Sequence, residues 1–406
     1  MINTISGAVS LYIYKYDKEY YFFGDVHDTR KNNCYDKGMT CDAFNYNFTA
    51  TTNANTNCTT LGALLYNWFR YNNDQHIKTD FYLEEYYTKE NERPDDVEFT
   101  NMIKNRSIVN TRQGSPFKDK SWMQLLPYIM APCFIREKQN CPFYPNVHLH
   151  YTDVRTIVTS TGLVDMTPFS IQNILIYIIE HQPTSIEALS LLRDDILNLI
   201  HYFTENFKTL FYYLMNNQID EYKKALLSTK SAFVLEIIDH IDYFISNGQF
   251  KIAKELQRLK IKNPSIHDQL LNYVDAIIDK TLVPIKQYQE SLDNEMRKYN
   301  TMKKRNVLHV RGLRRGYEDL LKIIKGYDLL FVNLETIIMD IYTLARMFIQ
   351  DGDVVIVYAG AYHINIYKDF FNLLTEPLLS IPYQKGNNCL THDDIPLYIH
   401  ANEFKL

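Results

Sequence analysis

Runs of aromatic and β-branched residues near both ends of the chain predict strands. Residues 8–16 (AVSLYIYKY) and 19–26 (EYYFFGDV) are two such runs with a short polar link, which predicts a β-hairpin. Residues 81–87 (FYLEEYY) predict a strand that ends in acids, and residues 146–154 (NVHLHYTDV) alternate apolar and polar positions. Residues 353–360 (DVVIVYAG) form a continuous apolar run, which is typical of a strand buried on both faces of a parallel sheet.

Helical spacing of apolar residues dominates the middle of the chain. Residues 59–74 and 364–374 predict one helix beside each group of strands, and residues 160–350 are helical in pattern throughout. Within that stretch Thr184 and Glu187 have the spacing of a capping box, which predicts that a helix starts at Thr184.

These patterns together predict an α/β fold. A mainly parallel sheet is built from residues 1–159 and from the last strand and helix in residues 351–406. Residues 160–350 form a large helical insertion between the two parts. The length of 406 residues, of which 46% are hydrophobic and 22% charged, is enough for one large domain or two smaller ones.

Charge and cysteine content limit the binding partners and the cellular location that we expect. The net charge of -5 gives no basic field for nucleic acid, and no apolar run is long enough to span a membrane. Six cysteines without a C-x-x-C pair favour a reducing compartment, so we expect a cytoplasmic protein. The 32 tyrosines, with frequent Asn, Ile and Lys, indicate an AT-rich genome such as that of a large DNA virus, which would place the protein in the host cytoplasm or the virion.

Two segments share a local design that suggests a site. An apolar strand is followed by Gly24 and then His27, and another is followed by Gly360 and then His363. Ligands of open parallel sheets bind beyond the carboxyl ends of the strands, and glycine there allows a tight turn or close backbone approach. The repeated G-x-x-H spacing therefore predicts that the two histidines meet at one edge of the sheet.

The other two inner strands also end in polar groups. Glu84 closes one strand, and Asp153 and Arg155 close the other. With the two histidines, these residues are able to bind a divalent metal through imidazole and carboxylate. They are equally able to hold a water-activating base, with the arginine stabilising negative charge. Both interpretations remain open from the residues alone.

The order of these four motifs resembles the erythromycin-esterase/ChaN/TraB/Tiki superfamily. The first motif there often reads GE-x-H-D, where this chain has GDVHD, so that Asp25 stands for a glutamate and shortens the carboxylate's reach by a methylene. The resemblance covers residues 15–160 and 350–375, and the helical insertion has no counterpart in it.

The resemblance implies a hydrolase-like site in some members and a binding protein in others. It implies catalytic roles for His27, Glu84, Arg155 and His363. It also implies that a divalent ion such as Mn²⁺, Zn²⁺ or Co²⁺ would be held by His27, Asp25, Glu84 and His363.

Two functions from different classes fit this picture. The first is an esterase- or peptidase-like hydrolase with a small-molecule or peptide substrate. The alternative is a non-catalytic virion or host-interaction protein with a protein partner, built on a degenerate hydrolase-like scaffold. The aspartate at position 25 and the unmatched helical insertion favour the second function.

Other polar clusters have simpler interpretations. His148 and His150 point to one face of their strand, where packed histidines are favoured. Glu236, Asp239 and His240 share a helical face that would suit a metal, but a solvated face is favoured. The basic run over residues 297–315 is interpreted as a solvent face, because the chain as a whole is acidic.

Overall fold

The computed structural model divides the chain into two compact units. The α/β unit comprises residues 1–153 and 350–406, and the helical unit comprises residues 154–349. The residues that the structure describes are 4–6, 8–25, 58–86, 144–153, 156–159, 162–165, 171–238, 251–303, 310–383 and 389–391.

A mixed sheet forms the centre of the α/β unit. Its described strands follow the order β10-β2-β3-β9-β5-β6. These strands are β2 (Ser10–Lys15), β3 (Glu19–Asp25), β5 (Thr79–Tyr86), β6 (Val147–Asp153), β9 (Val354–Gly360) and β10 (Leu379–Ile381). The four strands from β3 to β6 in this order are parallel, while β2 and β10 add antiparallel partners at one side. The predicted α/β class with a mainly parallel sheet is therefore confirmed.

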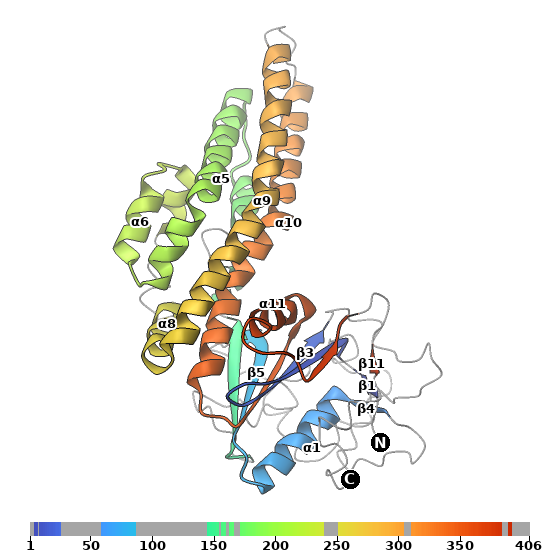
Figure 1. Cartoon of the computed structure of the whole chain (residues 1–406). Coiled ribbons are helices and arrows are strands. Elements are labelled where there is room, and N and C mark those ends of the chain that lie inside the picture. Colours follow the sequence, from blue (N-terminus) through green and yellow to red (C-terminus); the bar gives the residue numbers. More distant parts are fainter. Residues whose placement is uncertain are drawn as a thin grey trace. The chain divides into compact units, whose positions relative to one another are not determined.

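Strand β9 occupies the middle of the sheet, and its sequence explains why. All seven residues of β9 are buried, as expected for a strand covered on both faces. It lies between β3 and β5, which come from the first part of the chain (Figure 1). The pairing with β3 runs in register from Glu19 opposite Val354 to Asp25 opposite Gly360, so these two strands end side by side.

Helices cover both faces of this sheet. Helix α1 (Leu61–Asp74) packs Trp68 edge-on against Tyr21 at 4.6 Å between ring centroids. Helix α11 (Ala361–Phe371) packs Phe371 against Phe22 of the same strand at 4.9 Å. Because successive residues of a strand point to opposite faces, these contacts place α1 and α11 on opposite sides of the sheet. Burial of each large apolar side chain contributes about 1.5–3 kcal/mol, so both layers hold the sheet in place.

A smaller sheet belongs to the same unit. Its order is β11-β1-β4, formed by β1 (Thr4–Ser6), β4 (Cys58–Thr60) and β11 (Cys389–Thr391). Ile5 and Leu390, which pair across it, are buried in the same core as the residues of α1.

Helices make up most of the described part of the helical unit. They are α4 (Ile171–Glu180), α5 (Ile186–Met215), α6 (Ile219–Leu227), α8 (Lys251–Lys262), α9 (Pro264–Lys303) and α10 (Val310–Ile349). Helix α10 packs against α4, α5, α8 and α9. The two 40-residue helices α9 and α10 lie side by side over much of their length (Figure 1). Within the described ranges, no helix is both long enough and apolar enough to span a membrane.

Two local features of the helical unit differ from the sequence predictions. The stretch from residue 160 was expected to be helical, but β8 (Gly162–Asp165) pairs antiparallel with β7 (Thr156–Thr159) ahead of the helices. Helix α5 is capped by Ser185 rather than Thr184, because Ser185 is extended and its hydroxyl accepts the Ala188 N–H at 3.1 Å. The capping-box spacing therefore indicated the right turn but the wrong cap residue.

Candidate functional site

Four strand ends meet at one edge of the sheet, as the sequence predicts. Strands β3, β9, β5 and β6 are neighbours and parallel, so their carboxyl ends face the same way. Asp25 pairs with Gly360 at the ends of β3 and β9, and Leu83 pairs with Tyr358 one residue before Glu84. This edge is the place where an open parallel sheet binds its ligands.

Glu84 and His363 form a buried pair at this edge. His363 Nε2 lies 3.2 Å from Glu84 Oε1, and only 6% of the His363 side chain and 9% of the Glu84 side chain are exposed. The second carboxylate oxygen, Oε2, accepts the backbone N–H of Gly360 at 2.6 Å. One carboxylate from β5 therefore holds both the end of β9 and the imidazole in the first turn of α11.

The two glycines of the G-x-x-H motifs have different structural roles. A Cβ atom at Gly24 would collide with the Ser10 hydroxyl and lie 3.3 Å from Ala361 Cα, so close packing excludes a side chain there. Gly360 is the N-cap of α11 with φ -54 and ψ 143, a conformation open to any residue. The expected close backbone approach is confirmed at Gly24, while Gly360 contributes its N–H to Glu84.

Asp25 is buried but lies on the other face of the sheet. Tyr21 and Phe23 of the same strand belong to the core under α1. Asp25 lies two residues after Phe23, so its side chain points to the same face of the sheet. Leu83 also belongs to that core, so Glu84, the next residue, points to the α11 side. Burial is the main cause that raises the pKa of the Tyr358 hydroxyl well above its usual value. The charge of Asp25 and its hydrogen bond to Tyr358 raise this pKa further.

Two predicted site residues lie outside the described part of the chain. His27 comes two residues after β3, and Arg155 comes two residues after β6. Their roles stay predictions that rest on the strand ends they follow. Of the four predicted catalytic residues, Glu84 and His363 are described, and the structure brings them together.

The described residues fit a metal only in part. Glu84 Oε1 and His363 Nε2 are 3.2 Å apart, close to the spacing of about 3.4 Å between two ligands on one tetrahedral zinc ion. Catalytic zinc sites use three protein ligands. Among the described residues Asp25 does not complete a three-residue group with this pair. The predicted metal set would therefore depend on His27.

A second polar cluster, which sequence reasoning did not single out as a unit, lies at the amino end of β5. Asp80 is fully buried, and its Oδ1 lies 2.9 Å from His150 Nε2 and 3.4 Å from His148 Nδ1. Its Oδ2 accepts the backbone N–H of Gly352 at 2.9 Å, just before β9 begins. Tyr82 stacks on the His150 ring with 4.5 Å between centroids. The favoured interpretation of His150 as a packed histidine agrees with its burial.

Asp80 remains a carboxylate despite its burial. Burial alone would raise the pKa of Asp80. Hydrogen bonds from His148 and His150, together with the positive charges of His150 and Lys18, hold the pKa well below its ordinary value. The Lys18 ammonium in turn donates to the Gln350 carbonyl at 2.8 Å. This cluster lies at the edge opposite the strand carboxyl ends, and its contacts fasten the segment that leads into β9.

Comparisons with protein families, with curated proteins and with solved structures find no match for this chain. The superfamily resemblance therefore stays a prediction.

Proposed function

We propose that the chain is a hydrolase of the esterase or peptidase type, in which His363 activates water and Glu84 orients the His363 ring. The observation that carries this proposal is the buried Glu84–His363 pair at the carboxyl edge of the sheet, with 3.2 Å between Oε1 and Nε2. A buried carboxylate–imidazole pair at the ligand-binding edge of an α/β sheet has the arrangement that general-base catalysis needs.

The chemistry follows from which atoms face each other. Glu84 Oε1 accepts the proton on His363 Nε2, which puts the basic lone pair of the neutral ring on Nδ1. Nδ1 then takes a proton from the attacking water, and the adjacent carboxylate stabilises the imidazolium that forms. A positioned base of this kind contributes about 10²–10⁴-fold to a rate. Because Gly360 fixes the other oxygen of Glu84, little reorientation is required during the step.

The remaining parts of the proposed site come from the neighbouring strand ends. His27 follows β3, which ends in register with β9, and we propose it as the second imidazole of the site. Arg155 follows β6, the neighbour of β5, and would hold the negative charge that develops on a carbonyl oxygen in the transition state. The substrate is then a small molecule or a peptide with an ester or amide bond, and the low cysteine content supports a cytoplasmic location.

Purified full-length chain, assayed on panels of short-chain esters and peptides with and without Mn²⁺ or Zn²⁺, tests this proposal. His363→Gln retains a donor for Glu84 but removes the base, so we expect a loss of about a hundred-fold or more in kcat/KM. His201→Gln is the matched control, because it makes the same change at an exposed position of α5. Equal activity in the two variants, or no turnover by the wild type on either panel, would favour the non-catalytic interaction protein instead.

A further inference from the structure

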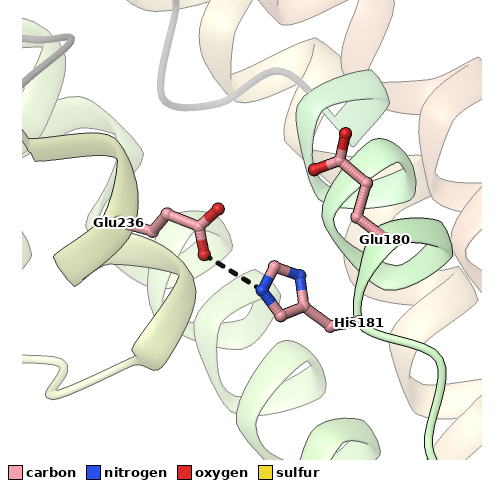
Figure 2. Close-up of side chains that lie close together, drawn as sticks. All are labelled: Glu180, His181 and Glu236. Atoms are coloured by element: carbon pink, nitrogen blue, oxygen red, sulfur yellow. Dashed lines mark ion pairs between the residues drawn. The ribbon is translucent and has the colours of Figure 1, made fainter.

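Three side chains that bind metals in other proteins gather on the helical unit. Glu180 is the last residue of α4, His181 follows it, and Glu236 belongs to the helical turns at 232–238. Each residue offers one ligand atom, and these atoms lie within 4.8 Å of one another. Figure 2 shows the His181 ring between the glutamate of its own segment and Glu236 of the neighbouring helix.

The His181 ring is oriented by a contact outside this group. Its Nδ1 lies 3.0 Å from the backbone carbonyl oxygen of Tyr177, and the ring stacks on the Tyr177 ring with 4.2 Å between centroids. A carbonyl oxygen only accepts hydrogen bonds, so Nδ1 carries the proton. Nε2 is then the ring nitrogen that would bind a metal. A histidine whose other nitrogen donates to a backbone carbonyl is the usual arrangement of a metal ligand.

The Nε2 atom faces a carboxylate oxygen of the neighbouring helix. His181 Nε2 lies 3.4 Å from Glu236 Oε2, and about half of each side chain is exposed. The distance of 3.4 Å matches the spacing of about 3.4 Å between two ligands on one tetrahedral zinc ion.

The end of α4 adds to the negative potential. The carboxyl end of a helix carries a partial negative charge, which favours cations and disfavours acids. Helix α4 nevertheless ends in Glu180, and its last turn contains no basic residue. A bound cation would offset both the helix end and the two carboxylates.

We propose that Glu180, His181 and Glu236 form a binding site for a divalent transition-metal ion, of which zinc is the representative. One imidazole nitrogen and two carboxylate oxygens are a ligand set that Zn²⁺ accepts, with water in the remaining position. The ion joins the end of α4 to the helix that carries Glu236. This site lies in the helical unit and does not depend on the proposed hydrolase.

Zinc titration of the full-length, chelator-treated chain tests the site by calorimetry and by competition with a chromophoric chelator. We expect His181→Ala to weaken one zinc equivalent at least about ten-fold, because even the loss of a residue that only hydrogen-bonds to a ligand weakens metal sites by about 10–100-fold. Glu236→Gln should weaken the same equivalent. Substitution of Co²⁺ should give a visible absorption band in the wild type that His181→Ala removes.

His201→Ala is the matched control, since His201 is also an exposed histidine of the helical unit. Repeating the titrations in a His363→Gln background separates this equivalent from any ion bound at the sheet edge. His181, Glu236 and His201 are exposed, so substitutions at these positions should leave the chain folded. His363 is buried, and glutamine retains a donor there. Equal zinc affinity and an equal Co²⁺ spectrum in wild type and His181→Ala would overturn the proposal and leave the His181–Glu236 contact as a surface ion pair.

Discussion

Glu84 Oε1 lies 3.2 Å from His363 Nε2, and the orientation of this pair is fixed from both sides. The Gly360 N–H binds the other carboxylate oxygen, and the histidine belongs to the first turn of the helix that Gly360 caps. The proposed base and its positioning residue are thus held by the rigid core of the sheet rather than by a loop.

Glu84→Gln tests the positioning role. An amide in place of the carboxylate still contacts Gly360, but it no longer provides a negative charge for the imidazolium that forms on His363. We expect kcat to fall about a hundred-fold or more with KM little changed, and the melting temperature to fall by only a few degrees. Steady-state kinetics beside a thermal melt measures both. A variant that melts like the wild type and retains full kcat would remove Glu84 from the mechanism.

The burial of His363 also predicts a stability difference between two substitutions. His363→Ala leaves the nearly buried Glu84 carboxylate without its hydrogen bond from His363, and an unsatisfied buried charge costs about 3 kcal/mol or more. His363→Gln retains a donor at that position and should cost about 1 kcal/mol. Urea denaturation of both variants checks the difference. Similar free energies of unfolding for the two would show that the pair contributes little to the fold.

Gly352→Ala should destabilise the α/β unit. The new Cβ would meet the Asp80 carboxylate, with 2.8 Å to Cγ, and overpacking of this kind costs about 1–3 kcal/mol. Asp80→Ala removes the obstructing group, so the double variant should be less destabilised than the sum of the two single variants. Chemical denaturation of the four proteins gives this coupling energy. Strict additivity would contradict the contact.

Asp80 should make stability depend on pH in acid. Its pKa is lowered in the folded chain, so it contributes stability above the unfolded pKa of about 3.9, and this contribution is lost as the pH falls toward the lower folded value. Asp80→Asn should therefore be about 2 kcal/mol less stable at neutral pH, and the difference should shrink below about pH 4. Urea denaturation across this range measures it. A difference that stays constant with pH would show that the Asp80 charge is not responsible.

Buried tyrosines should limit stability in alkali. Burial raises the pKa of the Tyr14, Tyr20 and Tyr21 hydroxyls, and carboxylates bonded to Tyr20 and Tyr21 raise them further. Stability is unaffected below the unfolded pKa of about 10 and falls above it, because only the unfolded chain releases these protons. Tyrosinate absorbance should then rise together with the loss of circular dichroism. Ionisation of all tyrosines before unfolding would refute their burial.

The sequence predicts the sheet well because its strands are chemically distinct. The continuous apolar run of β9 indicates a central parallel strand, and the aromatic hairpin of β2 and β3 is found in the structure. Helix α11 begins at Ala361, before the predicted residue 364, because the apolar spacing does not reveal that Gly360 caps it directly. Boundaries depend on local hydrogen bonds, which a pattern of apolar positions does not contain.

The candidate site is predictable to the extent that it depends on strand order. Glu84 lies near the carboxyl end of β5 and His363 follows β9, and the shared edge of these neighbouring strands brings them together. The Asp80 cluster is harder to foresee, because β5 begins at Thr79, before the aromatic run that marks it, and Asp80 resembles a loop residue in sequence. The alternation of His148 and His150 is the signal that a buried acid faces them.

The central position of β9 has a consequence for synthesis on the ribosome. Its partners β3 and β5 are complete by residue 86, whereas β9 ends at residue 360, after the whole helical unit. Translation at about 5–20 residues per second leaves an interval of roughly 10–50 seconds in which β3 and β5 each have an unpaired edge. Chaperones that shield nascent strands therefore have this interval in which to act, and the sheet closes only when one of its last strands emerges.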